Sequence, residues 1–204
     1  MKPKSPINPH FFERDPLTCA RDLIGKTLLW NGVGGRVVET EAYAEHGDEA
    51  CHTFFRPSAR DFVTRNSAGT IYTYLNYGVH WLFNILVKDA SGGENGFVLL
   101  RALEPTIDLA IMCERRGRSR PRDLCSGPGK LTQALGIDGN SHGKSIHAES
   151  ACCFLEDGAE DSTLSKEEPR VVADVRVGIS RATDLPWRFL SAGSPHVSVR
   201  ARQP

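Results

Sequence analysis

The 204-residue sequence contains no apolar run of about 18 residues, so it predicts no transmembrane helix. Its first residues, MKPKSPINPHFF, lack the apolar stretch and the cleavage site of a secretory leader, and we expect a cytoplasmic protein, nucleoid-associated in a bacterium. The 25 basic and 25 acidic residues give a net charge of zero, which argues against binding of nucleic acids through overall positive charge.

None of the six cysteines has a partner at CxxC spacing, and Cys152 and Cys153 are adjacent, which disfavours a bridge between them. We therefore expect reduced thiols, most of them packed in the interior. His46, Cys51 and His52 do not have the spacing of a structural zinc site. The sequence predicts no metal and no other cofactor.

Charge is unevenly distributed along the chain. Residues 156–168 hold six acidic residues and one lysine, so the remainder of the chain carries a charge of +5. Residues 115–122, RRGRSRPR, hold five arginines. This arginine run is either a solvated loop or a patch that contacts phosphates.

Strands and helices alternate irregularly along the chain, and the links between strands are short, which favours antiparallel pairing. The fold class predicted is α/β (α+β): a single compact domain over residues 1–204, with a curved, mostly antiparallel sheet and peripheral helices. Residues 53–62 are interpreted as a loop. The predicted strands are 27–31, 36–43, 69–75, 80–87, 97–104, 151–156, 170–179 and 196–200; the predicted helices are 15–25, 106–116 and 125–137, with one helical turn at 46–52.

The strand VVETEAY at residues 37–43 contains two carboxylates. Strand alternation predicts that Val37, Glu39, Glu41 and Tyr43 share one face. Two acids on one face could form the acid and base of a hydrolase for a small molecule. Alternatively, one of them is a catalytic base and the other forms ion pairs.

The stretch IYTYLNYGVHW at residues 71–81 predicts a β-hairpin. Tyr72 and Tyr74 share a face, and Tyr77 lies in the turn. The tyrosine in the turn either folds back on a neighbouring loop or serves as a wedge between base steps of DNA. The same hairpin and the arginine run would also suit a nucleic-acid binding module without enzymatic activity.

The segment SGPGK at residues 126–130 fails the P-loop pattern, because leucine occupies the first glycine position and also follows the lysine. Ser126 is expected to cap the predicted helix. Backbone amides at the start of that helix, together with Lys130, could hold a single backbone phosphate.

Six motifs in order, ETEAY, DEACH, YxYxxYG, LLRALEP, LCSGPGKL and GSPHVSV, make the chain from about residue 8 to about residue 200 resemble the alkyladenine (3-methyladenine) DNA glycosylase family. The resemblance implies a single α/β domain whose hairpin enters the minor groove of DNA. It also implies a monofunctional enzyme that flips a damaged purine out of the duplex and hydrolyses its N-glycosidic bond. The lesions implied are 3-methyladenine, 7-methylguanine, hypoxanthine and ethenoadenine.

The resemblance also assigns roles to individual residues. Glu41 would be the general base that activates water, with Arg101 beside it. The flipped base would be held by Tyr43, His52, Tyr72, Tyr74 and Asn84. The residues implied to contact DNA are Tyr77 as the wedge, Val79, His80, Ser126, Gly127 and Lys130. The expected partner is double-stranded DNA with a damaged purine, bound by a monomer that does not associate with membranes.

Overall fold

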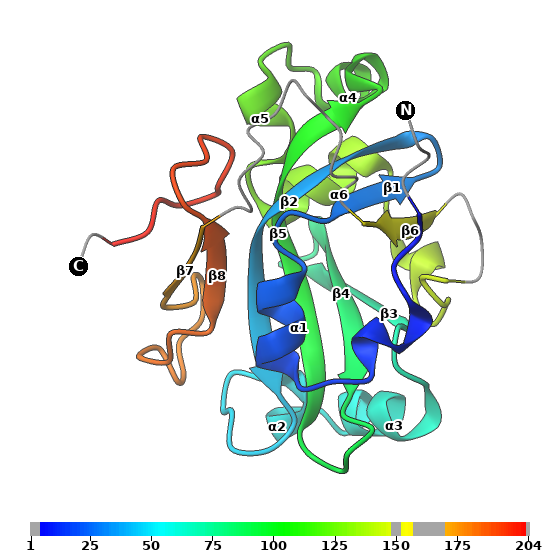
Figure 1. The fold of residues 1–204 in the computed structure, drawn as a ribbon, viewed down its shortest axis with the longest axis vertical. Coiled ribbons are helices and arrows are strands. Elements are labelled where there is room, and N and C mark those ends of the chain that lie inside the picture. The colour runs from blue at the N-terminus through cyan, green and yellow to red at the C-terminus, as the bar shows by residue number, and fades with distance from the viewer. Residues whose placement is uncertain (1–4, 148–151, 157–169, 203–204) are drawn as a thin grey trace.

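The computed structural model describes residues 5–147, 152–156 and 170–202 (Figure 1). Its centre is an antiparallel sheet in the order β3-β4-β5-β2-β1-β6, with β8 paired to β2 and β7 paired to β8. This confirms the predicted mixture of helices with an antiparallel sheet. The strands are β1 Thr27–Trp30, β2 Val33–Ala44, β3 Ile71–Asn76, β4 His80–Lys88, β5 Asn95–Ile107, β6 Cys152–Leu155, β7 Val171–Asp174 and β8 Arg188–Ser191.

The two long strands β2 and β5 pair along their length, from Gly34 opposite Ile107 to Ala44 opposite Gly96. The other edge of β2 is divided between β1 and β8. The ladder between β2 and β5 shifts register between residues 37 and 39 and again between residues 39 and 40. Such bulges break strict alternation. The prediction that Val37 shares the face of the two glutamates is therefore wrong, since Val37 packs in the main core with Ala42.

Helices cover the sheet and its two ends. Helix α1 packs against β2 and β5, and Asp15 caps it as predicted, because its carboxylate accepts a hydrogen bond from the backbone of Thr18 at 2.9 Å. Figure 1 shows α2 and α3 at one end of the sheet and α4 and α5 at the other. The helices are α1 Pro16–Asp22, α2 His52–Phe55, α3 Pro57–Arg65, α4 Leu109–Arg116, α5 Pro121–Cys125 and α6 Pro128–Leu135, with short 3-10 turns at Pro9–Phe12 and Gly139–Ser141. No helix of the described segments is long and apolar enough to cross a membrane.

Residues 46–62 differ from the prediction. The predicted helical turn at 46–52 is wrong in its bounds, because residues 46–51 form bends around a single turn closed by Asp48 and Cys51, and helix α2 begins only at His52. The predicted loop at 53–62 is helical instead and belongs to α2 and α3. Pro57 occupies the first turn of α3, where its missing N–H costs no intrahelical hydrogen bond.

Two predicted helices have different boundaries. The helix expected at 106–116 begins at Leu109, because strand β5 continues to Ile107. The helix expected at 125–137 is interrupted: α5 ends before Ser126, and α6 starts after Gly127, whose φ of 149° few other residues adopt. Ser126 therefore does not cap the helix; it forms a bridge with Ala102 of β5.

The C-terminal part of the chain contains a strand that the sequence did not predict. The strand expected at 170–179 is confined to β7, and the strand expected at 196–200 is absent from these described residues. Strand β8 at 188–191 joins β2 instead. The acidic segment 156–168 lies outside the described residues except for Glu156, which forms an ion pair with Lys26.

Candidate active site

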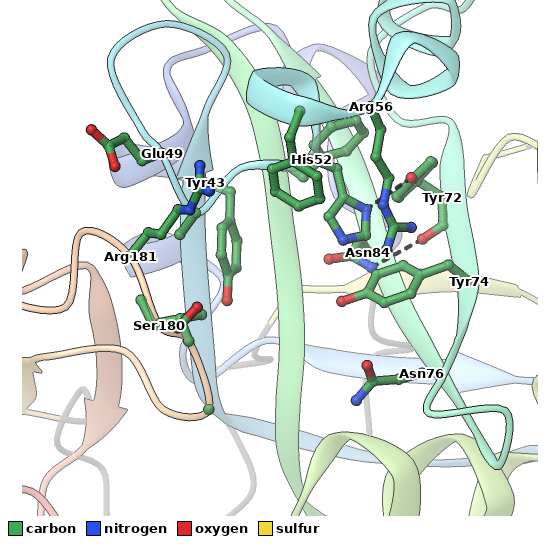
Figure 2. A pocket seen from close by; sticks show the side chains of 15 residues that line it. Tyr43, Glu49, His52, Arg56, Tyr72, Tyr74, Asn76, Asn84, Ser180 and Arg181 are labelled. Atoms are coloured by element: carbon green, nitrogen blue, oxygen red, sulfur yellow. Dashed lines mark hydrogen bonds between the residues drawn. The ribbon is translucent and has the colours of Figure 1, made fainter.

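A cavity of about 380 Å³ opens beside the C-terminal half of β2 (Figure 2). Its walls come from β2, helix α2, the hairpin strands β3 and β4, strand β5 and the loop after β7. The lining residues are Tyr43, Glu49, Ala50, His52, Phe55, Arg56, Tyr72, Tyr74, Asn76, Asn84, Phe97, Gly178, Ile179, Ser180 and Arg181. All five residues that the sequence analysis assigned to the flipped base are among them.

Aromatic rings form opposite walls of the cavity. Figure 2 shows Tyr43 on one side and His52 with Tyr74 on the other. The rings of His52 and Tyr74 have centroids 4.4 Å apart, and His52 Nδ1 lies 2.9 Å from the hydroxyl of Tyr72. Two flat walls facing a gap suit a planar aromatic guest, which gains stacking energy on both faces.

The aromatic walls of the cavity are uncharged at neutral pH. Burial, with a smaller contribution from the nearby Arg56 guanidinium, lowers the pKa of His52 to about 4. Burial also raises the pKa of Tyr74 to about 12 and that of Tyr43 well above its usual range. These rings are therefore neutral hydrogen-bonding surfaces.

Asn84 of strand β4 lies opposite Tyr72 of strand β3 in the hairpin register. Its side-chain amide donates a hydrogen bond to the carbonyl oxygen of Tyr72 at 3.1 Å, and the residue is 4% exposed. This bond fixes the orientation of the amide in the cavity wall. A polar group held in this way discriminates among planar guests by their edge substituents more strongly than an apolar wall does.

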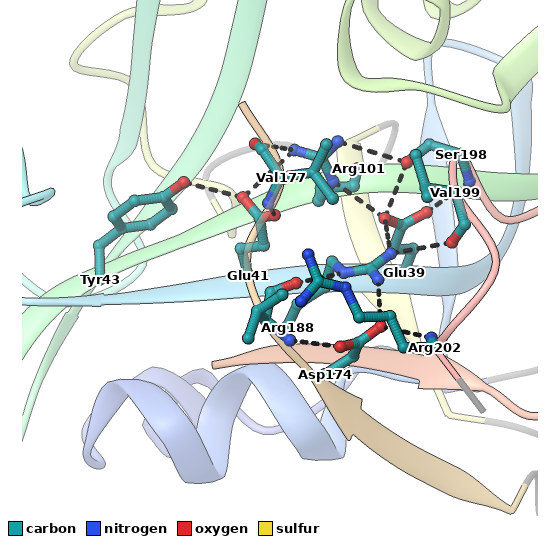
Figure 3. A network of polar contacts seen from close by, with 11 residues as sticks. Glu39, Glu41, Tyr43, Arg101, Asp174, Val177, Arg188, Ser198, Val199 and Arg202 are labelled. Carbon is teal, nitrogen blue, oxygen red and sulfur yellow. Dashed lines mark hydrogen bonds and ion pairs between the residues drawn. The ribbon is translucent and has the colours of Figure 1, made fainter. Parts of the chain in front are cut away.

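Glu41 lies directly behind the Tyr43 wall (Figure 3). Its Oε2 accepts hydrogen bonds from the Tyr43 hydroxyl at 2.8 Å and from Arg101 at 3.2 Å, and its Oε1 accepts one from the backbone N–H of Val177 at 2.7 Å. Glu41 is fully buried and is not among the lining residues. All three neighbours are donors, which is the environment that a carboxylate requires in a protein interior.

Glu39 is bound in the interior by ion pairs, as the sequence analysis expected for one of the two carboxylates. It accepts hydrogen bonds from Arg101 at 2.9 Å, Arg188 at 3.1 Å and the Ser198 hydroxyl at 2.8 Å. Arg101 thus bridges both glutamates. Glu41 contacts the cavity-lining Tyr43, whereas the partners of Glu39 lie away from the cavity, so the geometry does not support an acid and base pair formed by the two carboxylates.

A second buried ion pair, between Asp48 and Arg176, was not predicted from the sequence. The two bonds measure 2.6 and 2.7 Å, and both side chains are fully buried. The Arg176 guanidinium also lies 4.6 Å from the centre of the Tyr43 ring and 5.1 Å from that of Trp187. Because Val177 follows Arg176, this pair holds both the Tyr43 wall and the N–H that binds Glu41.

The hairpin tip projects from the molecule. Tyr77 is 89% exposed and Val79 is 68% exposed, so Tyr77 does not fold back on a neighbouring loop. Tyr77 and Gly78 have φ of 50° and 68°, the left-handed conformations of a type I′ turn. Positive φ is unfavourable for tyrosine and marks a candidate functional position.

The start of helix α6 packs beside the hairpin. A Cβ atom on Gly129 would lie only 2.9 Å from the Cβ and Cγ atoms of His80. Lys130 is exposed at this helix start, next to Gly127, while Ser126 is half-buried. His80, the first residue of β4 after the turn, therefore lies against the segment for which we expected contact with a DNA phosphate.

The arginine run divides into two groups. Arg115 and Arg116 donate to the carbonyl oxygens of Ala134 and Leu124, so they hold α4 to α5 and α6. The other three are exposed, Arg118, Arg120 and Arg122, and Arg115 is exposed as well. These four are accessible to phosphates.

The comparisons with known proteins cover nearly the whole chain. Residues 10–195 match the family described as Methylpurine-DNA glycosylase (MPG). A relative from Nitrosospira multiformis is 45% identical over 193 residues, which span 95% of this chain and 94% of the relative. Another from Chlorobaculum tepidum is 41% identical over 194 residues, which span 92% and 88%. Both are named "Putative 3-methyladenine DNA glycosylase".

Proposed function

We propose, from the premise that this chain belongs to the methylpurine-DNA glycosylase family, how its residues excise a damaged base. The chain is a 3-methyladenine DNA glycosylase of base excision repair, and its substrate is damaged DNA. A base inside a duplex is out of reach, so the enzyme extrudes the damaged nucleotide into the cavity. The aromatic walls and the 380 Å³ volume support this assignment of the cavity.

Stacking compensates for the cost of extrusion. The flipped purine lies between Tyr43 and the group of His52, Tyr72 and Tyr74. Tyr77 fills the gap that the flipped base leaves in the DNA duplex, and Val79 and His80 lie beside it in the minor groove. Each base–aromatic stack is worth about 1–3 kcal/mol, which is comparable to the few kcal/mol that unstacking costs. Ser126, Gly127 and Lys130 hold the DNA backbone next to the hairpin.

Glu41 activates the attacking water. The water oxygen bonds to C1′ of the sugar while the C1′–N9 bond breaks, the electron pair leaves on the purine, and the water proton passes to Glu41. Arg101 holds Glu41 in place. The hydrogen bond from Tyr43 supports this assignment, because it connects the buried carboxylate to a wall of the base cavity.

The product is an intact abasic site. Lyase activity requires an amine that forms a Schiff base with the sugar. None of the described lysines lines the cavity, which supports a monofunctional enzyme. The lesion range comprises 3-methyladenine, 7-methylguanine, hypoxanthine and ethenoadenine, and Asn84 excludes undamaged guanine by crowding its exocyclic amino group.

The hydrogen bond between Tyr43 and Glu41 is the observation that carries the proposal, and Glu41→Gln tests it. A duplex with one hypoxanthine is incubated with excess enzyme, and abasic sites are then cleaved with alkali. The variant keeps the shape but loses the base, so excision falls roughly 10²- to 10⁴-fold while binding of the lesion duplex persists. An unchanged rate would contradict the role of Glu41. If the parent protein also failed to excise the base, the result would favour a module that only binds DNA.

A further inference from the structure

Arg56 is a cation inside the base cavity to which none of the preceding steps assigns a role. It lies at the junction of α2 and α3, with an extended backbone at φ −116° and ψ 110°. The following residue is Pro57, and a proline disfavours the helical conformation in the residue before it. Figure 2 shows the Arg56 side chain extending from this junction into the cavity beside Tyr72 and Tyr74.

Arg56 is exposed at the cavity, so its charge can face a guest. Its guanidinium carbon lies 5.7 Å from the centre of the Tyr74 ring. The guanidinium also lies beside the Tyr72 side chain, since its charge and a hydrogen bond oppose the rise that burial causes in the pKa of Tyr72. Arg56 takes part in none of the ion pairs found among the described residues. By contrast, the lining cation Arg181 lies on the Tyr43 side of the cavity with Glu49.

We propose that Arg56 determines lesion specificity: its guanidinium donates hydrogen bonds to the acceptor edge of an uncharged damaged purine and disfavours a purine that carries a positive charge. This inference rests on the proposed function and names the preferred substrate class of the same site. The planar guanidinium has five N–H donors that match adjacent ring and carbonyl acceptors.

The chemistry of the leaving group explains why such a donor matters. When the C1′–N9 bond of an uncharged purine breaks, the electron pair leaves the base with a negative charge spread over its ring. Hydrogen bonds from Arg56 stabilise this charge, the guanidinium stays protonated, and the departing base takes its proton from solvent. A cationic purine such as 7-methylguanine leaves as a neutral molecule and needs no such help. Its charge is instead repelled by Arg56.

Single-turnover excision from two duplexes tests the inference, one with hypoxanthine and one with 7-methylguanine, with free base measured by chromatography. Arg56→Gln lowers hypoxanthine release roughly 10- to 100-fold, the range expected for a lost hydrogen bond from a charged group. Release of 7-methylguanine stays equal or rises. Arg56→Lys keeps the charge without the planar donors, so its ratio of the two rates lies between those of the parent and Arg56→Gln.

The matched control is Arg65→Gln, which removes an exposed arginine from the far end of α3 and leaves the ratio at the parent value. The inference is overturned if Arg56→Gln leaves the ratio of the two rates unchanged. If both rates fall by the same factor, Arg56 only contacts a phosphate; if neither rate changes, Arg56 has no role in excision. A parent enzyme that releases neither base contradicts the proposed function itself, which is a different result.

Discussion

Glu39 shows how the role of a carboxylate depends on the residues that surround it. Two residues from Glu41 on the same strand, it is equally buried, but it binds Arg101 and Arg188, whereas Glu41 binds the cavity-lining Tyr43. The sequence identifies two acids on one strand, but only the partners that fold against them distinguish a base from a structural carboxylate. The difference leads to a prediction that separates the two.

We expect Glu39→Gln to reduce stability much more than it reduces excision. The change leaves Arg101 and Arg188 with one buried negative charge fewer, and breaking a buried ion pair costs about 3–5 kcal/mol. Urea denaturation measures this loss, and single-turnover excision by the folded variant is compared with that of Glu41→Gln. If Glu39→Gln slowed excision more than Glu41→Gln did, the general base would be Glu39.

The exposed ring of Tyr77 at the hairpin tip leads to a prediction about DNA binding. Tyr77→Ala removes the ring from an exposed tip and leaves the buried core untouched. Losing one stack of about 1–3 kcal/mol lowers lesion-duplex affinity and excision roughly 10- to 100-fold. Fluorescence anisotropy and single-turnover kinetics measure both. Thermal unfolding of the free variant serves as the control, and equal affinities for parent and variant would show that the tip does not enter DNA.

Among the elements, the hairpin was the most predictable from the sequence. Alternation places Tyr72 and Tyr74 on one face, and Asn76-Tyr77-Gly78 supplies the turn, so strands β3 and β4 and both cavity tyrosines follow from local chemistry. Helix α3 did not follow. Its many polar and charged residues obscure a helical pattern of buried positions at Ala59, Phe62 and Val63, and the proline that starts the helix resembles a loop signal.

The contact between helix α6 and the hairpin gives the element-scale prediction. We expect Gly129→Ala to displace the hairpin, because the added methyl group would lie 2.9 Å from two atoms of His80. Excision and lesion affinity both fall, since Tyr77 is no longer aligned with the phosphate contacts of α6. Combining the change with His80→Ala removes the ring atoms from this clash and restores part of the affinity. If the single variant bound as tightly as the parent, the position of the hairpin would be independent of α6.

For the whole molecule, the least predictable feature is the Asp48–Arg176 pair. Its members are 128 residues apart in the sequence, and no local pattern relates a bend after β2 to a loop after β7. The same holds for Val177, whose N–H reaches Glu41 across 136 residues. The resemblance to a family identified Glu41 and Tyr43. Periodicity and turn chemistry, by contrast, predict only contacts within an element or between neighbouring strands. Long-range polar contacts require the folded chain.

Breaking this pair is the prediction for the whole molecule. Asp48→Ala leaves the Arg176 guanidinium buried without its carboxylate, which costs about 3–5 kcal/mol of unfolding free energy. The loss appears as a lower midpoint in urea. Asp61→Ala, which removes an exposed ion pair with Arg65, is the matched control and leaves the midpoint close to that of the parent. Equal midpoints for the two variants would mean that the buried pair contributes little to stability.

The partners of the two glutamates also set an order of assembly during synthesis on the ribosome. A nascent chain that has emerged as far as residue 147 already contains Tyr43, His52 and Tyr74 and the long strands that position them. Glu41 still lacks the N–H of Val177, and Glu39 lacks Ser198. A domain generally folds as a unit. The aromatic residues of the cavity are synthesised first, but Arg176, which packs on Tyr43, and the lining residues 178–181 come later. The last part of the chain therefore completes the cavity and orients its carboxylate in the same step, and a chain released early would have neither.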